Sequence, residues 1–246
     1  MAWFFTPENI ETEEYLITGE DARHIGKSLR MREGEEVFLV TPDGMLLTCE
    51  IQKITSESVS VRIISKKACD TEPDVKVTLY QCLSKGEKME TVIQKAVELG
   101  VSAIVPVISS RCISRPDEKS LRKKEERWRK IALSAAQQSR RGIVPSVEKT
   151  ISFEKALDSV KEREKGILFY ELGGDSLRKI VEDFTSDNIK NVAVFVGSEG
   201  GFEESEAALA KEKGVVLATL GKRILRTETA PLAALSAIMC LTGNMD

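Results

Sequence analysis

The sequence contains a single histidine, His24, among its 246 residues. Zinc sites with two histidine ligands and acid–base schemes with paired histidines are therefore excluded. A Ser–His–Asp triad would have to use His24 alone, and no Gly-x-Ser-x-Gly motif accompanies it. The scarcity of histidine thus argues against metal and triad chemistry, and we expect no bound metal ion.

The cysteines and the apolar segments limit the possible classes further. Five cysteines are scattered along the chain without a Cys-x-x-Cys pair, so we expect reduced and mostly buried thiols. No apolar run approaches the roughly 18 to 20 residues that a membrane-spanning helix needs, and the N-terminus lacks a basic and then apolar leader. We therefore expect a cytoplasmic protein without a membrane partner.

Two common nucleotide-binding motifs are missing as well. The chain has neither a Gly-x-Gly-x-x-Gly fingerprint nor a Gly-Lys-Ser/Thr phosphate loop. The sequence therefore does not favour an ordinary dinucleotide-binding or NTP-binding domain.

The net charge of −3 hides a strong asymmetry along the chain. Residues 111–141 carry 11 basic and 4 acidic side chains, a net of +7, whereas residues 1–72 carry a net of −6. A concentrated basic stretch on an acidic protein is typical of a phosphate-rich partner, because each neutralised phosphate releases counterions. The alternative is a solvated helix face, on which the mixed charges of residues 123–126 serve only solubility.

The first seventy residues have the pattern of a small β domain. Short segments rich in β-branched residues are separated by turn signals such as residues 42–44 (PDG). Asp21 is a candidate N-cap for one helix over residues 22–29, and the polar stretch 65–74 is typical of a linker. We expect a barrel or sandwich with strands over residues 37–40, 46–51 and 59–64.

From residue 73 onwards the pattern changes to alternating strands and helices, which predicts an α/β domain with a largely parallel sheet. The last helix, residues 231–241, is apolar nearly all round but too short to cross a membrane. It must be buried in the core or against a second subunit, and we expect a homodimer. The predicted strands cover residues 75–82, 103–108, 167–170, 192–196 and 215–218, and the other predicted helices cover 87–99, 119–139, 175–184 and 203–213.

Three loops of this second domain are candidates for a site, because ligands of parallel α/β sheets bind beyond the carboxyl ends of the strands. Residues 196–202 (VGSEGGF) follow a strand and open a helix, so their glycines allow a ligand to approach the backbone closely. The other two loops are residues 220–230 (LGKRILRTETA) and 169–174 (FYELGG). Simple turns explain the glycine loops equally well, and capping by Thr227 or Thr229 explains the remaining loop except for its arginine.

Two of these loops and three further segments resemble the RsmE family of bacterial enzymes, which methylate N3 of a uridine in 16S ribosomal RNA. The resemblance rests on Gly197–Phe202, on Leu220–Ala230, on residues 94–101 (QKAVELGV) and on residues 24–31 (HIGKSLRM). The family's central motif is matched by residues 137–140 (QQSR) with Pro145. The matches run in order through nearly the whole chain, and the tail motif, Leu220–Ala230, is highly specific.

The resemblance implies a PUA-like β-barrel RNA-binding domain over residues 1–72 and a SPOUT-type methyltransferase domain over residues 73–246. In that fold the C-terminal chain threads a deep trefoil knot, which general folding rules do not predict, and the knot loops hold S-adenosylmethionine. Carried over by position, the residues expected around this cofactor are Tyr170, Glu171, Val196, Gly197, Gly200, Gly201, Leu220, Gly221, Ile224, Leu225, Arg226 and Thr229.

The chemistry of uridine N3 indicates roles for three side chains. The N3 proton must be removed, and the negative charge that develops on the base must be stabilised. We expect Arg226 to stabilise the charge and Glu228 or Glu199 to accept the proton, although each glutamate could merely cap a helix. The expected contacts to 16S ribosomal RNA, within the small ribosomal subunit, are Arg23, His24, Arg30, Arg32, Arg111, Arg115, Lys123, Arg127, Arg140 and Arg141.

Two positions depart from the family pattern. Ser198 stands where the family usually has proline, and Trp3 where it often has arginine, so an RNA contact of that arginine would pass here to Arg23, Arg30 or Arg32. Two alternatives keep the same fold: a non-catalytic RNA-binding or ribosome-assembly protein, and a SPOUT methyltransferase for a different base. Cofactor binding separates the first alternative from an enzyme, because only an enzyme needs the glycine loop and the tail motif for this purpose.

Overall fold

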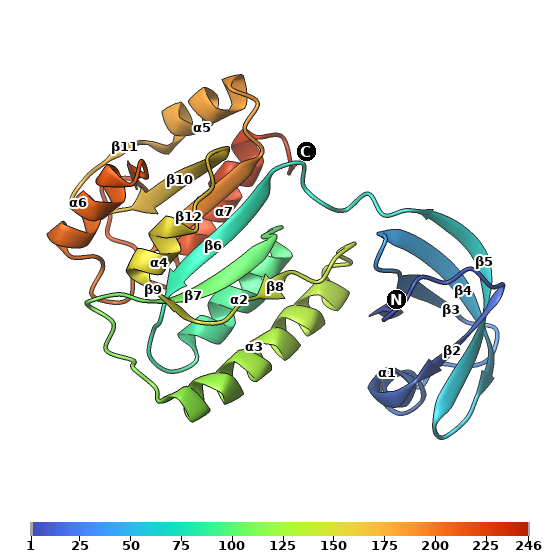
Figure 1. The fold of residues 1–246 in the computed structure, drawn as a ribbon. Coiled ribbons are helices and arrows are strands. Elements are labelled where there is room, and N and C mark those ends of the chain that lie inside the picture. The colour runs from blue at the N-terminus through green and yellow to red at the C-terminus, as the bar shows by residue number, and fades with distance from the viewer. Residues whose placement is uncertain (1, 246) are drawn as a thin grey trace. The chain divides into compact units, whose positions relative to one another are not determined.

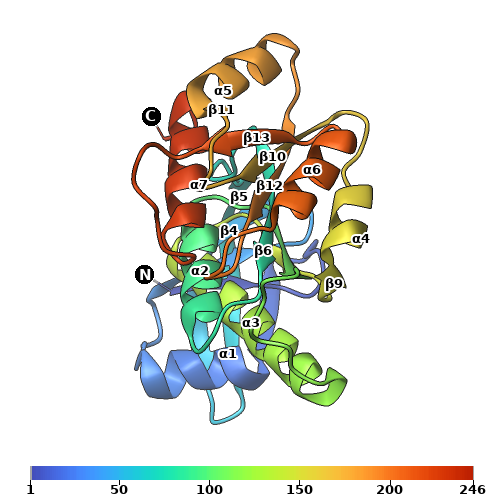
Figure 2. The same ribbon diagram turned by 90° about the vertical axis from the view of Figure 1, so that its left-hand side faces the viewer.

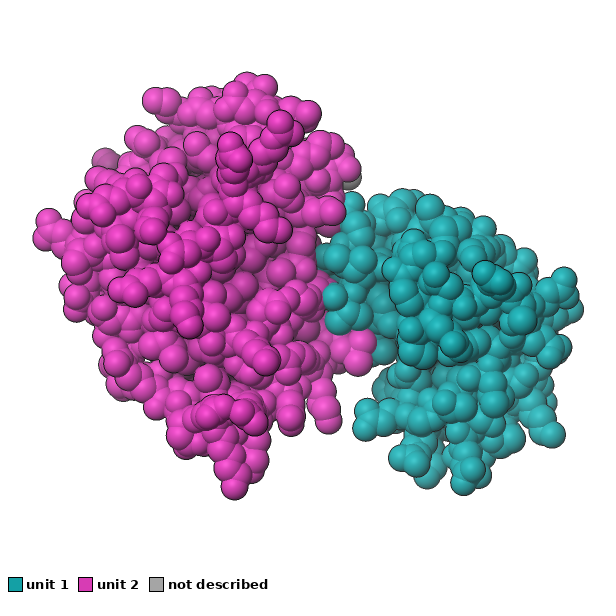
Figure 3. Space-filling view, viewed as in Figure 1, with its two compact units in different colours: residues 1–72, 136–144 teal, residues 73–135, 145–246 magenta. Residues whose placement is uncertain are grey.

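The computed structural model describes residues 2–245, which form two compact units (Figures 1 and 3). Unit 1 comprises residues 1–72 and 136–144, and unit 2 comprises residues 73–135 and 145–246. The predicted boundary lies between residues 72 and 73. It does not include residues 136–144, a short segment from the middle of the chain that completes unit 1.

A buried ion pair fixes residues 136–144 in unit 1. The Arg141 guanidinium donates to both Glu72 carboxylate oxygens at 2.8 and 2.6 Å, and its residue is only 3% exposed. The Trp3 indole N–H donates to the Arg141 carbonyl at 3.0 Å. Because a buried arginine is stable only when its donors are satisfied, these contacts tie both ends of residues 1–72 to the same arginine.

Unit 1 is built on one curled five-stranded sheet with the order β1-β3-β4-β5-β2 (Figure 1). Its strands are antiparallel except for β1, which runs parallel to β3. The inward side chains form an apolar core that includes Ile25, Leu39 and Leu47, each at most 1% exposed. The strands are β1 (Ala2–Phe5), β2 (Glu14–Thr18), β3 (Glu36–Val40), β4 (Met45–Ile54) and β5 (Ser58–Ala68).

The first helix of unit 1 begins earlier than its sequence pattern indicates. It comprises α1 (Gly19–Arg23) and a π-helical turn, η1 (His24–Ser28). Thr18 occupies the N-cap position, so the predicted cap at Asp21 is wrong. Asp21 lies instead in the first turn, where an acidic side chain interacts favourably with the helix dipole.

The predicted linker over residues 65–74 is also partly wrong. Strand β5 extends to Ala68 and stays paired with β4, where Thr48 faces Ser65 and Met45 faces Ala68. The backbone ladder continues because its hydrogen bonds do not depend on side-chain polarity. The exposed lysines at 66 and 67 made this end of the strand look like a loop.

Unit 2 contains a parallel sheet with the order β11-β13-β10-β12-β6-β7-β8, in which β9 also pairs with β7. Figure 2 shows α2, α5 and α7 on one face of this sheet and α4 and α6 on the other. The strands are β6 (Lys76–Cys82), β7 (Ala103–Ile108), β8 (Ser146–Val147), β9 (Ile151–Ser152), β10 (Glu164–Phe169), β11 (Asp175–Ser176), β12 (Asn191–Val196) and β13 (Val216–Thr219), and the helices are α2 (Lys88–Glu98), α3 (Glu118–Gln138), α4 (Phe153–Asp158), α5 (Leu177–Ser186), α6 (Glu204–Glu212) and α7 (Ala230–Leu241).

The long elements of unit 2 agree with the predicted α/β alternation, whereas α4 and the two-residue strands were not expected. The sheet centre is fixed by register: Phe195 of β12 pairs with Tyr80 of β6 and with Leu168 of β10. The rings of Phe195 and Tyr80 stack with centroids 4.5 Å apart. Strands buried on both faces read as continuous apolar runs, which is why sequence pattern located them well.

The chain reaches its last helix by crossing back over the sheet. After β13, which lies beyond β10, residues 220–229 return to α7, and α7 packs on α2, α5, β6 and β12. Pro231, Leu235 and Met239 are buried on one face of α7, which confirms the expected burial of that face. Among residues 2–245, no helix is both long and apolar enough to cross a membrane.

Candidate active site

The three loops singled out by their position after strands line one cavity of unit 2, with a volume of about 520 Å³. They meet because β10, β12 and β13 are parallel, so their carboxyl ends lie at one edge of the sheet. The lining contains every expected cofactor residue except Thr229: Tyr170, Glu171, Val196, Gly197, Gly200, Gly201, Leu220, Gly221, Ile224, Leu225 and Arg226.

The loop after β12 is folded too tightly for side chains at its glycines. A Cβ on Gly197 would lie 2.9 Å from the backbone of Gly201, and Gly201 itself has φ +66°. A Cβ on Gly201 would also collide with the Glu171 carboxylate from the loop after β10. These glycines are therefore required by the packing of one loop against the other, as well as by any close approach of a ligand.

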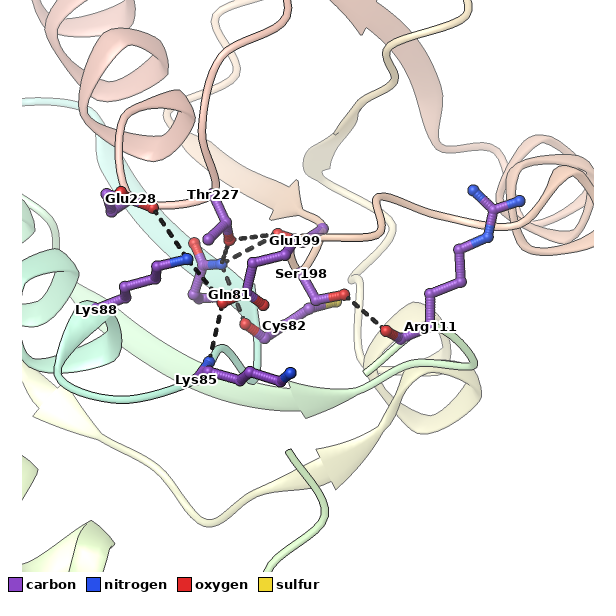
Figure 4. Close-up of polar contacts among 10 residues, drawn as sticks. Gln81, Cys82, Lys85, Lys88, Arg111, Ser198, Glu199, Thr227 and Glu228 are labelled. Carbon is purple, nitrogen blue, oxygen red and sulfur yellow. Dashed lines mark hydrogen bonds and ion pairs between the residues drawn. The ribbon is translucent and has the colours of Figure 1, made fainter. Parts of the chain in front are cut away.

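A buried hydrogen-bonded latch fastens the tail loop to this glycine loop (Figure 4). The Thr227 hydroxyl donates to the Gly197 carbonyl at 2.7 Å. The Gln81 amide at the end of β6 donates to the same carbonyl at 3.3 Å and to the Thr227 hydroxyl at 3.2 Å. Neither threonine of the tail loop caps α7, because Thr227 is engaged here and Thr229, at the N-cap position, makes no side-chain cap hydrogen bond. Thr229 therefore occupies the predicted N-cap position, but it does not cap the helix through its side chain.

Two carboxylates of the cavity face one ammonium group. Lys88 Nζ lies 2.9 Å from Glu199 Oε1 and 3.9 Å from Glu228 Oε2, and the Lys85 backbone N–H also donates to Glu199 at 3.0 Å. Burial alone would raise the pKa of Glu199, but the hydrogen bonds from Lys88 and Lys85 outweigh it and lower that pKa. Glu199 is therefore held as an ionised partner of Lys88, which does not favour it as a proton acceptor.

Glu228 and Arg226 are two of the polar side chains of the cavity that form no hydrogen bond with a described residue, and the exposed Lys222 and Arg223 of the same loop are others. Glu228 Oε2 is buried and has no hydrogen-bond partner, with only the Lys88 ammonium nearby at 3.9 Å. The Arg226 side chain is exposed and makes no hydrogen bond or ion pair with any residue that the structure describes. Both groups remain available to a bound reactant, which Glu199 is not.

The loop after β7 is hydrogen-bonded to the glycine loop after β12, with backbone carbonyls as the acceptors. The Ser198 hydroxyl donates to the Arg111 carbonyl at 3.1 Å, and the Arg111 guanidinium donates to the Gly200 carbonyl at 3.0 Å. Glu206 of α6 accepts from the Ser110 N–H at 2.8 Å. Ser198 thus replaces the rigidity of the proline usual in the family with a hydrogen bond between two loops.

A pair of thiols lies beside these loops. Hydrogen bonding from the Cys82 thiol is the main cause that lowers the pKa of Cys112 to about 6, although burial opposes it. Burial raises the pKa of Cys82 well above its ordinary value. Both cysteines are buried and, like the other three, carry no disulfide, so they hold the turn at Ser109 as hydrogen-bonding groups rather than as exposed nucleophiles.

The predicted RNA-contacting residues fall into three groups. Arg141 is buried against Glu72 and has no face for a phosphate, so that expectation is wrong. Arg111 and Arg115 donate to backbone carbonyls within unit 2, and Arg127 pairs with Glu90 at 2.6 Å. The remaining predicted residues are exposed: Arg23, His24, Arg30, Arg32, Lys123 and Arg140.

Sequence pattern missed several residues of this site. Gln81, Lys85 and Lys88 lie at the end of β6 and the start of α2, the same kind of strand-to-helix connection that singled out the other loops. This connection has only one glycine, Gly86, so it lacks the cluster of glycines that drew attention to the other loops. Trp3, the other departure from the family pattern, stacks on Phe38 in the interior of unit 1 and belongs to its core.

The residues of the cavity fit S-adenosylmethionine, the cofactor implied by the resemblance. Ile224 is apolar yet 83% exposed where it lines the cavity, and Gly197 and Gly201 form part of its wall without a side chain. An apolar wall with few polar groups is typical of nucleoside-sized ligand pockets, and free carboxylate capacity suits a cationic sulfonium. Among residues 2–245, no group of three or more His, Cys, Asp or Glu side chains is arranged to hold a metal.

Comparisons with known proteins agree with this geometry. A family model described as an RNA methyltransferase domain matches residues 71–239, and one described as an RNA methyltransferase PUA domain matches residues 17–64. A Bacillus subtilis (strain 168) protein named ribosomal RNA small subunit methyltransferase E is 37% identical over 233 residues, which cover 93% of this chain and 90% of the relative. The chain belongs to the RsmE family.

Other RsmE proteins extend the likeness to sequence and structure. The relative from Aquifex aeolicus (strain VF5) is 32% identical over 87% of this chain and 90% of its own length. The RsmE of Neisseria gonorrhoeae, solved bound to S-adenosyl methionine, superposes with a TM-score of 0.87, 34% identity and 98% coverage of both chains. A Legionella pneumophila methyltransferase solved with bound SAM also has a TM-score of 0.87, at 32% identity and 97% coverage of both chains. The α/β, SPOUT-type fold with an N-terminal PUA-like domain is thereby confirmed.

Proposed function

We propose that this protein is an S-adenosylmethionine-dependent methyltransferase that methylates N3 of a uridine in 16S ribosomal RNA. The observation that carries the proposal is the latched cavity: Thr227 and Gln81 hold the tail loop against Gly197 and leave Arg226 and Glu228 free at its wall. Membership of the RsmE family supports the same reaction and substrate. A non-catalytic RNA-binding protein would have no need of this cavity.

The proposed chemistry assigns one task to each free side chain. When bound, S-adenosylmethionine supplies a methyl group on a cationic sulfur. Glu228 accepts the uridine N3 proton, so that the nitrogen lone pair can form the new N–C bond as the S–C bond breaks. Arg226 offsets the negative charge that spreads over the uracil oxygens once N3 loses its proton. Lys88 keeps Glu199 ionised and in place beside the glycine loop.

Two further proposals concern the oligomeric state of the protein and the form in which it recognises its RNA. We propose a homodimer that uses the second face of α7, where Leu232, Ala233 and Ala237 are half-buried and Leu241 is exposed in one chain. We also propose that the RNA is recognised within the small ribosomal subunit in the cytoplasm. Sedimentation of the purified protein, alone and with small subunits, tests both statements.

Nucleoside mass spectrometry of 16S ribosomal RNA from cells that lack the protein tests the function directly. We expect 3-methyluridine to disappear and to return when the wild-type gene is restored. Restoration with the Arg226→Ala variant should fail to return it, although the variant still accumulates. Persistence of 3-methyluridine in the deletion strain would refute the reaction.

A calorimetric titration separates the enzyme from a binding protein of the same fold. We expect the purified protein to bind S-adenosylmethionine, and expect Gly197→Ala to weaken that binding while Gly26→Ala, in unit 1, leaves it unchanged. No binding to the wild-type protein would favour a non-catalytic role. Loss of a methylated base other than 3-methyluridine in the deletion strain would keep the enzyme but change its target.

A further inference from the structure

Unit 2 contains a second cavity, with a volume of about 370 Å³, that shares no lining residue with the first. It lies along the β6–α2 connection, the first turn of α2 and the middle of α3. The two cavities use different residues of one connection: Ser84, Gly86 and Glu87 line the second cavity, whereas Lys88 lines the first. The β6–α2 connection therefore lies between the candidate active site and the second cavity.

A buried hydroxyl in this second cavity has no partner. Ser84 is only 5% exposed, and its Oγ forms no hydrogen bond with any residue from 2 to 245. A buried hydroxyl without a partner costs free energy, so native structures rarely keep one without a reason. A ligand with oxygen acceptors, bound in the cavity that Ser84 lines, would supply the missing partner.

The backbone beside Ser84 also favours an anion. Helix α2 has eleven residues, and no side chain accepts from its N-terminal N–H groups, since Glu87 at the N-cap position makes no cap hydrogen bond. Such N–H groups and the helix dipole together favour negative charge at this end. Met89 and Glu90 of the first turn line the cavity, so this end of α2 forms part of its wall.

The side chains at the rim add positive charge. Lys123, Lys124 and Arg127 of α3 line the cavity, against two carboxylates, Glu87 and Glu90. Arg127 donates to Glu90 at 2.6 Å and keeps its other guanidinium N–H groups free, being 63% exposed. Lys123 and Lys124 form no ion pair with any residue in the described part of the chain. The balance is one net positive charge in addition to the helix dipole.

We propose that this cavity binds a backbone phosphate of the RNA substrate, close in the strand to the nucleotide that enters the first cavity. The inference rests on the proposed function. A phosphate diester suits a hydroxyl donor, helix N–H groups and lysines, whereas Trp128, the aromatic residue in the lining, is 3% exposed and offers no face for base stacking. The subsite therefore positions the strand and reads no sequence.

Lysine substitutions with a matched control test this subsite without requiring turnover. Filter binding of unmodified 16S RNA transcript to Lys124→Gln, at several salt concentrations, should show weaker binding and a salt slope less steep by about one unit. Lys130→Gln makes the same charge change on α3 outside the cavity lining, and should bind as the wild type does. Equal losses in the two variants would overturn the subsite in favour of a general charge effect.

The Ser84 hydroxyl gives a second test that separates binding from folding. Ser84→Ala removes an unpartnered buried group, so its thermal midpoint should equal or exceed that of the wild type. Its RNA affinity should nevertheless fall several-fold, with S-adenosylmethionine affinity unchanged. Wild-type RNA affinity in Ser84→Ala would overturn the proposal.

Inorganic phosphate distinguishes an RNA phosphate from a free anion as the occupant. Phosphate should compete with RNA for the wild-type protein and compete less well for Ser84→Ala. Phosphate that protects the wild-type protein against unfolding but leaves RNA binding unchanged would show a free-anion site and overturn the RNA assignment. If the wild-type protein binds RNA with these dependences yet transfers no methyl group, the proposed function fails and the subsite stands.

Discussion

At the scale of single residues, Arg226 combines exposure, a position in the cavity wall and freedom from any partner in the described chain. Arg226→Ala should lower kcat for methyl transfer by about 10²- to 10³-fold, the usual loss when one group that stabilises developing charge is removed. Arg226→Lys should recover part of this loss, because a point charge replaces a planar guanidinium. Full turnover by Arg226→Ala on ribosomal substrate would contradict its assignment.

The two candidate bases can be separated because Glu199 is hydrogen-bonded to Lys88 at 2.9 Å, whereas Glu228 lies 3.9 Å from the same ammonium without a hydrogen bond. Glu228→Gln should lower kcat by about 10²- to 10⁴-fold, as expected for loss of a general base, with little change in thermal midpoint. Glu199→Gln loses its ion pair with Lys88 and should mainly reduce stability and cofactor-loop order. Single-turnover rates and melting curves of both variants decide the point, and the reverse pattern would make Glu199 the base.

The Glu199–Lys88 pair also predicts a dependence of stability on pH. The folded state lowers the pKa of Glu199 below its ordinary value of 4.5, so the pair stabilises the fold above that value and loses this effect as the pH falls through the folded pKa. Lys88→Met should cost about 1 kcal/mol or less at pH 7, since the carboxylate is partly exposed. Urea unfolding at several pH values should show this difference shrinking below pH 4.5, and a constant difference would contradict it.

At the scale of elements, the glycine loop after β12 and the tail loop act as one structure. Gly197→Ala places a Cβ 2.9 Å from the Gly201 backbone, so one loop must shift and the Thr227 latch must lengthen. We expect a loss of about 1–3 kcal/mol in unfolding free energy and weaker S-adenosylmethionine binding. Gly26→Ala, whose Cβ would meet only an Ile54 methyl at 3.5 Å, is the control, and equal effects in both would contradict this view.

Elements that depend on a local sequence pattern can be predicted, whereas contacts between residues distant in the sequence cannot. Strands such as Val192–Val196 are continuous apolar runs, so local pattern locates them. The latch is different, because Gln81 and Thr227 are far apart in sequence and neither carries a local signal for the other. The position of residues 220–230 after a strand indicated the tail loop, and the family resemblance supplied the expected role of Arg226. Lys88 and Gln81 became visible only when the parallel sheet brought β6 beside β12.

At the scale of the whole molecule, two separate segments of the chain, residues 1–72 and 136–144, make up unit 1. Unit 1 should therefore fail to fold from residues 1–72 alone. That fragment lacks residues 136–144, and with them the Arg141 guanidinium that pairs with Glu72 and the Arg141 carbonyl that accepts from the buried Trp3 indole N–H. A buried donor left without its acceptor costs about 1–3 kcal/mol, which is a large share of the stability of a small domain. The fragment's only tryptophan, Trp3, should show red-shifted fluorescence. A blue-shifted, cooperatively unfolding fragment would contradict this prediction.

The inclusion of residues 136–144 in unit 1 could not be predicted from the sequence. A change of composition near residue 72 marks the first boundary, but residues 136–144 continue the basic stretch and contain no linker signal. Their place in unit 1 is set by Arg141, which charge counting assigned to RNA. One arginine can serve as phosphate ligand or buried counter-ion, and its burial decides between these roles.

The latch between Thr227 and Gly197 has a consequence for biosynthesis. Translation delivers the basic helix α3 and the glycine loop well before Thr227 leaves the ribosome, so the reaction cavity closes only near the end of synthesis. A chain that terminates before Thr227 would also lack α7, which packs on α2, α5, β6 and β12, so it would complete neither the cavity nor the core beneath it. The site of this protein therefore depends on the last residues of the chain, and a C-terminal truncation removes the cavity and part of the core together.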